Sequence, residues 1–469
     1  MMNTNIKLLF LSLLMFAKTL PLIAQEETIT KAFKESTIQS LNQMLNQFYV
    51  FPELALESEE HVNQLWEAGH FDQYSTLEAF ADALTESVRE VTHDKHIMVE
   101  KRMTSVAPVS TLDSWMAQKV ENQFYQRRYN SNFKSVTKLE GNVGVLDLRG
   151  FYNLAEGKAF ADLAMAQLAT SDAIVIDLRH NSGGRPEMIF YLIAHFFNEQ
   201  KQLSSAICRR GDEFTKHEGW SFEEIAGKRM PDVPLFLVTS STTFSAAEGF
   251  SYDLQVYDRA TIVGEITKGG ANPGGFELLN EQLQVFIPDC RVVNHITNSN
   301  WEGVGVIPDV KIDADQALDK AIELAQAAAK EFRAKPEAEY QALIAEMKAV
   351  LDNFEPGKSE SVLEEKLTQF HTWGLINEDE INAWGYEYLL QRQEIDIALV
   401  IMKTNISLYP KSANIVDSYA EALMTKGELE AALIQYEKAV ALAEEQGDPN
   451  LTVFQTNLAN LKQKMKAKD

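Results

Sequence analysis

The hydrophobic pattern in the middle of the chain predicts strands that alternate with helices. Short apolar runs of the kind found in buried strands are followed by loops and then by segments with helical periodicity. The predicted strands are Val143–Leu148, Ala173–Leu178, Leu235–Val238, Thr261–Val263 and Leu283–Ile287, and the predicted helices are Lys158–Leu168, Pro186–Phe197 and Ser245–Arg259. Such alternation requires crossover connections, so we expect an α/β fold whose mainly parallel sheet is covered on both faces.

The segment that precedes this pattern is predicted to be helical. Apolar residues recur at helical spacing from Ile38 to Phe48, until Pro52 interrupts them. A second helix begins at Ser75-Thr76-Leu77-Glu78, which has the form of a capping box, and its apolar stripe extends to Val91. The next residues predict a helix end followed by a short strand, whereas positions 103–139 carry no clear pattern.

The last part of the chain is predicted to be entirely helical. An Ala- and Glu-rich helix is expected over Asp313–Arg333, and two later segments match at an offset of thirty-four residues, the period of tetratricopeptide repeats. The matched pairs are Gly385 with Tyr419, Leu389 with Leu423, Ala398 with Ala432, Met402 with Tyr436, and Asn405 with Ala439. The alternative is an ordinary helical bundle. Stacked repeats form a concave surface, which would bind a peptide, a protein partner or the rest of this chain.

A chain of 469 residues is too long for one hydrophobic core, and its patterns predict four regions. These are a signal peptide (1–24), an N-terminal helical subdomain (25–100), an α/β core (101–335) and a helical, tetratricopeptide-like region (336–469). The signal peptide is predicted because Lys7 precedes the apolar run Leu8–Phe16, and Leu22-Ile23-Ala24 forms a cleavage site before Gln25. No cysteine lies near that site to carry a lipid.

Composition narrows the classes of partner and the cellular location. The formal net charge of −25 argues against nucleic acid and anionic membranes as partners, because phosphate would be repelled. No later run reaches the roughly 18 apolar residues of a membrane-spanning helix. We therefore expect an exported protein, periplasmic or secreted, with no integral membrane segment after signal removal. Cys208 and Cys290 allow one disulfide in an oxidising compartment but no metal site, and no cofactor is expected.

The stretch Thr239–Phe250, TSSTTFSAAEGF, carries the candidate nucleophile. It connects a predicted strand to a predicted helix, and a serine at such a junction lies where unpaired backbone N–H groups favour negative charge. Acyl-transfer enzymes use this arrangement to expose a nucleophile and stabilise an oxyanion. Ser245 is the candidate. The alternative is that the hydroxyl residues only cap a helix.

A serine hydroxyl needs a base, and histidine is the usual one. His96 lies at a helix-to-strand junction beside Asp94, with His93 as a competitor, although a lone histidine is more often structural. The paired glycines Gly183-Gly184 follow a buried strand and can aim an N–H at an oxyanion, or simply form a tight turn. The chain lacks the GxGxxG and GK[ST] patterns, so nucleotide binding is not expected.

Four stretches in one order resemble a known family of serine peptidases. They are DKHIMV, VIDLRHNSGG, TFSAAEGF with RATIVGEITKGGANP, and EGVGVIPDV, within Leu77–Val310. The family includes tail-specific (C-terminal processing) protease, tricorn core protease and the repeats of interphotoreceptor retinoid-binding protein. The resemblance implies a crotonase-like α/β core. The chain is most similar to the tricorn and retinoid-binding branch, because there is no room for a PDZ module between Val99 and Val143.

The resemblance also implies roles for individual residues. The nucleophile position falls on Ser245, the base on His96, and the partner of the base on Glu302. The oxyanion donors would be the N–H of Ala246 and one N–H of the pair Gly183-Gly184. The tail-specific branch uses a Ser–Lys dyad instead, but its lysine position falls on Gly270, with Lys268 two residues earlier as the alternative base. One departure from tricorn is that Lys95 replaces the serine before the histidine.

These observations predict an exported serine endopeptidase that cleaves proteins or peptides without a metal or cofactor. Two rivals belong to other classes. Retinoid-binding repeats keep this fold as carriers of apolar ligands, so a non-catalytic carrier is the main alternative. The other is an assembly scaffold dominated by the helical repeats. The joint presence of Ser245, His96 and Glu302 favours the peptidase.

Overall fold

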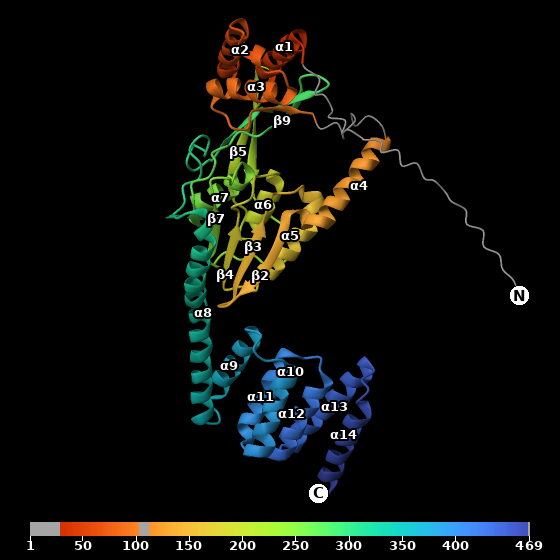
Figure 1. Cartoon of the computed structure of the whole chain (residues 1–469). Helices are drawn as coiled ribbons and strands as arrows, with labels where there is room; N and C mark the ends of the chain where they lie inside the picture. The colour runs from red at the N-terminus through yellow and green to blue at the C-terminus, as the bar shows by residue number, and fades with distance from the viewer. Residues whose placement is uncertain (1–28, 103–111, 468–469) are drawn as a thin grey trace, which may run out of the picture. The chain divides into compact units, whose positions relative to one another are not determined.

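The computed structural model describes residues 29–102 and 112–467 (Figure 1). The chain divides into two compact units, Met1–Phe332 and Arg333–Asp469. The predicted signal peptide, residues 1–24, lies outside the described residues. Among the helices that the structure describes, none is long and apolar enough to cross a membrane.

The core of the first unit is a six-stranded sheet in which every pairing is parallel except that of β2 with β3. In spatial order its strands are β12 (Val310–Lys311), β8 (Thr261–Gly264), β7 (Leu235–Thr239), β4 (Ala173–Asp177), β3 (Val143–Leu148) and β2 (Phe133–Leu139). Every residue of β4 and β7 is buried, as expected for parallel strands covered on both faces. The predicted mainly parallel sheet is confirmed.

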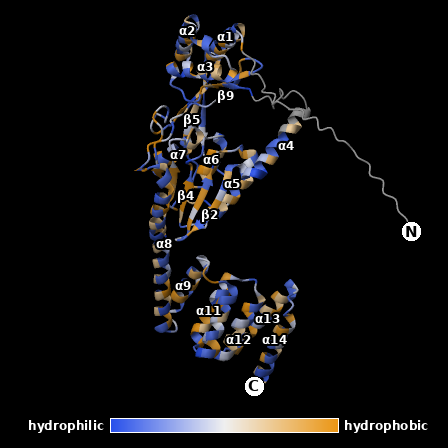
Figure 2. Ribbon diagram, in the orientation of Figure 1, coloured by the Kyte–Doolittle hydropathy of each residue, from blue (hydrophilic) through white to orange (hydrophobic). Residues whose placement is uncertain are grey.

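Different helices cover the two faces of this sheet. Ile174 and Ile176 pack among the helices α5 (Leu154–Leu168), α6 (Pro186–Ala194) and α7 (Ala246–Val256). Val175, which points to the opposite face, packs against α8 (Ala314–Asp352), whose buried alanines recur every four residues: Ala317, Ala321, Ala325 and Ala329. Figure 2 shows the corresponding concentration of hydrophobic residues on the central strands.

The helix predicted to end at Arg333 is longer than expected. It continues through Pro336 to Asp352. Proline removes one backbone donor and usually ends a helix, at a cost of about 3 kcal/mol. Here the flanking Ala, Glu and Lys residues are strong helix formers, and the later turns bury Leu343 and Met347 in the core of the second unit.

The N-terminal layer combines helices with a sheet that comes largely from later in the chain. The helices α1 (Lys31–Phe48), α2 (Pro52–Glu67), η1 (His70–Gln73) and α3 (Leu77–Thr92) are followed by β1 (Met98–Lys101). This strand pairs with β10 (Leu283–Pro288), which pairs in turn with β9 (Gly274–Leu278). Val285 and Ile287 of β10 share one core with helical residues such as Leu41 and Leu84. The N-terminal helices therefore pack on a hairpin almost two hundred residues away in sequence.

A third sheet and one further helical segment complete the first unit. The sheet contains β11 (Cys290–Val293), β5 (Gln202–Arg210) and β6 (Glu213–Trp220). Cys208 and Cys290 lie opposite each other on β5 and β11 and form a disulfide. The stretch without a clear sequence pattern contains α4 (Leu112–Tyr129) and η2 (Asn130–Asn132) before it enters β2.

The second unit is entirely helical in the residues that the structure describes, up to residue 467, as predicted. It contains the end of α8 and then α9 (Glu360–Thr372), α10 (Glu378–Tyr386), η3 (Glu387–Arg392), α11 (Ile395–Leu408), α12 (Ala413–Lys426), α13 (Leu429–Gln446) and α14 (Leu451–Lys466). The matched repeat positions Ala398, Met402, Ala432 and Tyr436 are all buried. Gly427 ends α12 in the left-handed conformation, at the turn between α12 and α13.

Candidate active site

Ser245 occupies a strained turn between β7 and α7. It is the N-cap of α7, with φ 54° and ψ −119°, a conformation that non-glycine residues rarely adopt. Such backbone strain costs about 1–3 kcal/mol and persists only where the surroundings impose it. A strained strand-to-helix turn presents the serine hydroxyl away from the sheet, as a nucleophile requires.

The surroundings that impose this turn centre on Glu248, which is fully buried. Its carboxylate accepts hydrogen bonds from the N–H of Ser245 (2.8 Å), the N–H groups of Gly269 (2.6 Å) and Gly270 (2.9 Å), and the hydroxyl of Thr267. Glu248 thus ties the start of α7 to the loop that follows β8. Glu248 is not among the site residues predicted from the sequence, although Ser245-x-x-Glu248 has the form of a capping box.

Two backbone N–H groups near Ser245 are available to an oxyanion. Gly183 approaches so closely that an added Cβ would lie 2.9 Å from Cβ of Ser245 and 3.0 Å from the nitrogen of Ala246. However, the Gly183 N–H already donates to Oδ1 of Asn181 (2.9 Å). Within the described part of the chain, the N–H groups of Ala246 and Gly184 donate to no acceptor, and both residues line the cavity in front of Ser245. Of the three residues predicted to supply oxyanion donors, Ala246 and Gly184 therefore have a free backbone N–H, whereas Gly183 does not.

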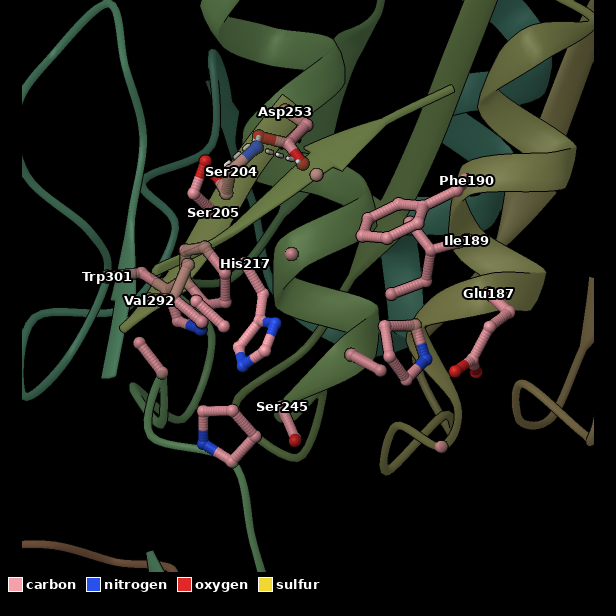
Figure 3. A pocket seen from close by; sticks show the side chains of 18 of the residues that line it. Glu187, Ile189, Phe190, Ser204, Ser205, His217, Ser245, Asp253, Val292 and Trp301 are labelled. Atoms are coloured by element: carbon pink, nitrogen blue, oxygen red, sulfur yellow. Dashed lines mark hydrogen bonds between the residues drawn. The ribbon is translucent and has the colours of Figure 1, made fainter. Parts of the chain in front are cut away.

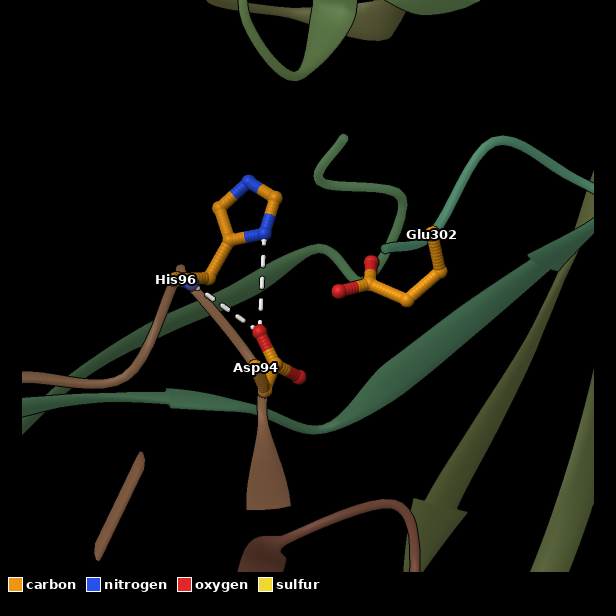
Figure 4. Close-up of side chains that lie close together, drawn as sticks. All are labelled: Asp94, His96 and Glu302. Carbon is orange, nitrogen blue, oxygen red and sulfur yellow. Dashed lines mark hydrogen bonds and ion pairs between the residues drawn. The ribbon is translucent and has the colours of Figure 1, made fainter. Parts of the chain in front are cut away.

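His96, Asp94 and Glu302 lie close together (Figure 4). One ligand atom from each of the three lies within 4.8 Å of the others. Nδ1 of His96 is 3.8 Å from Oδ1 of Asp94, and the same oxygen accepts the backbone N–H of His96 at 3.0 Å. The other Asp94 oxygen accepts from Asn272 (2.9 Å) and from the hydroxyl of Tyr49 (3.3 Å). Asp94 is thus the carboxylate nearest the ring, although the predicted partner of His96 is Glu302.

This cluster contains buried polar atoms that lack partners. Among the described residues, neither ring nitrogen of His96 nor Oε1 of Glu302 has a hydrogen-bond partner, whereas the other Glu302 oxygen accepts the N–H of Ala271. Burial, together with the charges of Lys268 and Arg89, lowers the pKa of His96 to about 4. Burial and the neighbouring Asp94 raise the pKa of Glu302 to about 7. A neutral imidazole therefore lies beside a carboxyl group that titrates near neutral pH.

The imidazole lies beside the residue that precedes Ser245, but it is not bonded to the serine. The ring of His96 is 4.4 Å from that of Phe244 and 6.0 Å from that of Phe286. Gly270 permits this approach, since an added Cβ would lie 2.2 Å from Phe244 and 2.7 Å from His96. Throughout residues 29–102 and 112–467, no hydrogen bond joins Ser245 to His96 or to Lys268. The ammonium of Lys268 lies 4.6 Å from the centre of the Phe244 ring.

His93, the competing histidine, has a structural role. It is the exposed C-cap of α3 in the left-handed conformation, where it ends the helix. Within the described chain, the set Asp94, His96 and Glu302 is the one group of such side chains close enough to hold a metal ion. That no metal takes part remains a prediction from the sequence.

A cavity of about 310 Å³ opens in front of Ser245 (Figure 3). Its lining includes Ser245, Ala246, Gly184 and Gly270 at one end, and side chains from α6, α7, β5 and β11 beyond them. A strained serine at a helix N-terminus, two free N–H groups and an adjoining cavity are the features of a serine hydrolase.

Comparison with known families shows which kind of serine hydrolase this chain resembles. Residues 142–312 match the model of peptidase family S41, and residues 24–134 match the model of the N-terminal domain of peptidase S41 in eukaryotic IRBP. Over these residues the chain matches peptidase family S41, a family of serine peptidases, and the resemblance predicted from the four motifs is confirmed.

Individual relatives are distant. A probable CtpA-like serine protease of Staphylococcus aureus (strain COL) is 26% identical over 201 residues, which are 40% of this chain and 37% of that protein. The match thus spans well under half of the curated relative. The photosystem II D1 C-terminal processing protease (14% identity, TM-score 0.39) aligns over 61% of this chain and 94% of its own. A putative peptidase from Parabacteroides merdae (16% identity, TM-score 0.44) aligns over 62% and 96%, respectively.

Proposed function

We propose that this chain is an exported serine endopeptidase with Ser245 as its nucleophile. The observation that carries the proposal is the strained turn at Ser245, with the free N–H groups of Ala246 and Gly184 beside it and a cavity in front. A serine that merely capped a helix would not need the strained backbone conformation of Ser245. The substrates we propose are proteins or peptides, in keeping with the family.

In the proposed mechanism, His96 takes the hydroxyl proton as Ser245 attacks the peptide carbonyl carbon. The carbonyl oxygen becomes an oxyanion, which accepts hydrogen bonds from the backbone N–H groups of Ala246 and Gly184. The imidazolium then gives its proton to the leaving amine, and water hydrolyses the acyl-enzyme by the same steps. Glu302 is the proposed positioning residue: its partnerless Oε1 would accept the ring N–H and stabilise the imidazolium.

The base must approach Ser245 for this mechanism to operate. Catalytic hydrogen bonds are often long in unliganded enzymes and shorten in the substrate complex. The His96 ring already contacts Phe244, next to the nucleophile, and we propose that these two side chains rearrange to bring the ring to Ser245. The alternative base, Lys268, shares the Phe244 contact, so a Ser245–Lys268 dyad is the second form of the same proposal.

A chemical probe tests the proposal. The mature protein is treated with a fluorophosphonate, which labels activated serines, and compared with Ser245→Ala. We expect labelling of the wild type and its loss in the variant. Ser241→Ala is the matched control, since Ser241 is an exposed serine in the same loop and should leave labelling unchanged. Labelling that persists in Ser245→Ala would end the assignment of the nucleophile.

One observation favours a second function. The cavity is lined mainly by apolar side chains, as a carrier of apolar ligands would require. Tight binding of a hydrophobic fluorescent ligand, together with no cleavage of any peptide in a diverse library, would favour the carrier. We also propose that the helical repeats of α10–α14 bind a peptide or protein partner.

A further inference from the structure

Asp94, His96 and Glu302 face one another at the candidate active site (Figure 4). In the part of the chain that the structure describes, they are the one group of such side chains whose ligand atoms all lie within 4.8 Å of one another. One imidazole nitrogen and two carboxylate oxygens are donors that Zn²⁺ binds at about 2.0–2.2 Å. Donors around a tetrahedral ion then lie about 3.4 Å apart. The 3.8 Å between Nδ1 of His96 and Oδ1 of Asp94 is close to that separation.

Two of the three side chains carry atoms that are buried and make no hydrogen bond. The His96 side chain is 8% exposed, and neither of its ring nitrogens has a partner among the described residues. Oε1 of Glu302 is likewise buried and unpartnered there. Each such atom costs about 1–3 kcal/mol, so a ligand that engages them gains affinity. A metal ion suits this closed space better than water or a peptide group, because it contacts its donors at about 2 Å, whereas a hydrogen bond needs about 2.7–3.2 Å.

The second oxygen of each carboxylate is held by neighbouring residues, which orients the first. Oδ2 of Asp94 accepts from the side-chain amide of Asn272 (2.9 Å) and from the hydroxyl of Tyr49 (3.3 Å), so Oδ1 faces the ring. The backbone N–H of Ala271 engages Oε2 of Glu302 and leaves Oε1 free. Contacts of this kind orient the ligands of metal sites. Glu302 is also partly exposed, so it is the ligand that an entering ion reaches first.

We propose that Asp94, His96 and Glu302 form a Zn²⁺ site, and that the bound ion inhibits the peptidase reversibly. The site rests on the geometry of the three side chains, and the inhibition rests also on the proposed peptidase function. Nδ1 of His96 and one oxygen from each carboxylate supply three ligands, and water completes the tetrahedron. The two carboxylates balance the charge of the ion. Mg²⁺ and Ca²⁺ require shells of about six or more oxygen ligands, so the imidazole makes the site selective against them.

The inhibition follows from the chemistry of the imidazole ring. A neutral imidazole carries a proton on one ring nitrogen and a free lone pair on the other. When Zn²⁺ takes the lone pair of Nδ1, the proton lies on Nε2, and His96 cannot accept the proton of Ser245. The ion also takes Oε1 of Glu302, the oxygen proposed to accept the ring N–H. Only coordination bonds form and no group is transferred, so a chelator that removes the ion restores the base.

The first experiment measures binding of the metal alone. Zn²⁺ is titrated by calorimetry into chelator-treated, dialysed protein, and Co²⁺ is used in parallel because its visible absorption reports tetrahedral coordination. We expect saturable binding by the wild type. Loss of an outer contact of a metal site costs about 10–100-fold in affinity, so loss of a ligand in His96→Ala or Glu302→Gln should cost at least about 100-fold. His93→Asn is the matched control, since it removes an exposed imidazole while asparagine tolerates the left-handed conformation, and its affinity should equal that of the wild type.

Three results would overturn the site: no saturable binding of Zn²⁺ to the wild type, unchanged affinity in His96→Ala, or unchanged affinity in Glu302→Gln. Glu302→Gln keeps the size of the side chain, so its near-UV circular dichroism should match that of the wild type. A loss of Zn²⁺ binding in that folded variant then reports the loss of a ligand and not of the fold.

The second experiment measures fluorophosphonate labelling of Ser245 with saturating Zn²⁺ and again after EDTA. We expect labelling to slow by about 10²-fold or more, as when a general base is lost, and to recover fully with EDTA. His93→Asn should respond as the wild type does. Zn²⁺ that binds at the three residues without slowing labelling contradicts the inhibition. If the protein is not labelled even in EDTA, the peptidase proposal fails separately, and calorimetry still decides the metal site.

Discussion

Two glutamates of the candidate active site, Glu248 (buried) and Glu302 (partly buried), differ in how many hydrogen bonds their carboxylate oxygens accept. Glu248 accepts four hydrogen bonds, from Ser245, Thr267, Gly269 and Gly270. Glu302 accepts one, from Ala271, and its Oε1 has no partner among the described residues. Burial raises the pKa of both carboxyl groups, and that of Glu302 reaches about 7.

This difference distinguishes a structural carboxylate, that of Glu248, from one with a free oxygen that can accept a further hydrogen bond, that of Glu302. A satisfied buried network rigidifies its surroundings, whereas a partly satisfied one costs stability and is retained where function needs it. Glu248 holds the strained turn at Ser245. Glu302 and His96 retain free atoms through which a proton can be received and an imidazolium stabilised. Removing Glu248 should therefore lower stability, and altering the other cluster should lower activity.

The largest effect is expected from His96→Ala. Loss of the general base should slow fluorophosphonate labelling of Ser245 by about 10²–10⁴-fold. The free energy of unfolding in urea should fall by about 2–4 kcal/mol, because the buried ring packs against Phe244 and Phe286 although it makes no side-chain hydrogen bond, so labelling is compared in the absence of denaturant. A loss below tenfold would shift the assignment of the base towards Lys268.

The second largest effect is expected from Glu248→Ala, which should lower the stability of the protein. It leaves four donors unpaired in a buried site, so we expect a loss of about 3–5 kcal/mol in the free energy of unfolding. Glu248→Gln, which keeps the shape and one acceptor, is the matched control and should lose less. Urea denaturation measures both, and a loss below about 1 kcal/mol for the alanine variant would contradict the structural role.

Glu302→Gln should change the pH dependence. With its pKa raised to about 7, Glu302 keeps its proton below that pH and becomes a carboxylate above it. Labelling of Ser245 should therefore rise through about pH 7, and the variant should lose this rise together with about tenfold in rate. His96, with its pKa lowered to about 4, is neutral on both sides of the transition. Asp94→Asn is the comparison, and abolition of the rise in that variant alone would make Asp94 the positioning residue.

The smallest effect is expected from Lys268→Ala. If His96 is the base, labelling should change by less than about threefold. The lysine charge helps to lower the pKa of His96, so that pKa should increase in the variant, as measured by NMR titration of the imidazole. A loss of more than a hundredfold in labelling would establish the Ser–Lys dyad instead.

The parallel core could be predicted from sequence because its strands are continuous apolar runs. β3 was predicted with its observed bounds, and β4 and β7 within one residue of theirs. The hairpin β5–β6 was not predicted, because β6 is exposed along almost its whole length and shows no apolar alternation. Its position depends on pairing with β5 and not on its own burial pattern.

The parts of the candidate site that lie within sequence motifs could be predicted, whereas the contacts that depend on packing could not. Ser245, His96 and Glu302 each lie in a quoted motif, and the structure brings His96 and Glu302 together. The placement of Phe244 against His96 arises from loops that meet in space, which no local pattern encodes. The role of Glu248 could have been predicted, since its capping-box spacing from Ser245 is visible in the sequence.

The disulfide between Cys208 and Cys290 has a practical consequence for anyone who produces this protein. It joins β5 and β11, which carry the cavity-lining residues Ser205 and Val292, so one side of the cavity in front of Ser245 is held covalently as well as by the sheet. The bond closes a loop of 82 residues, which in the chain-entropy account disfavours the unfolded chain by about 4–5 kcal/mol. Material made in a reducing cytosol would lack this contribution, so its yield and its stability would understate those of the oxidised protein.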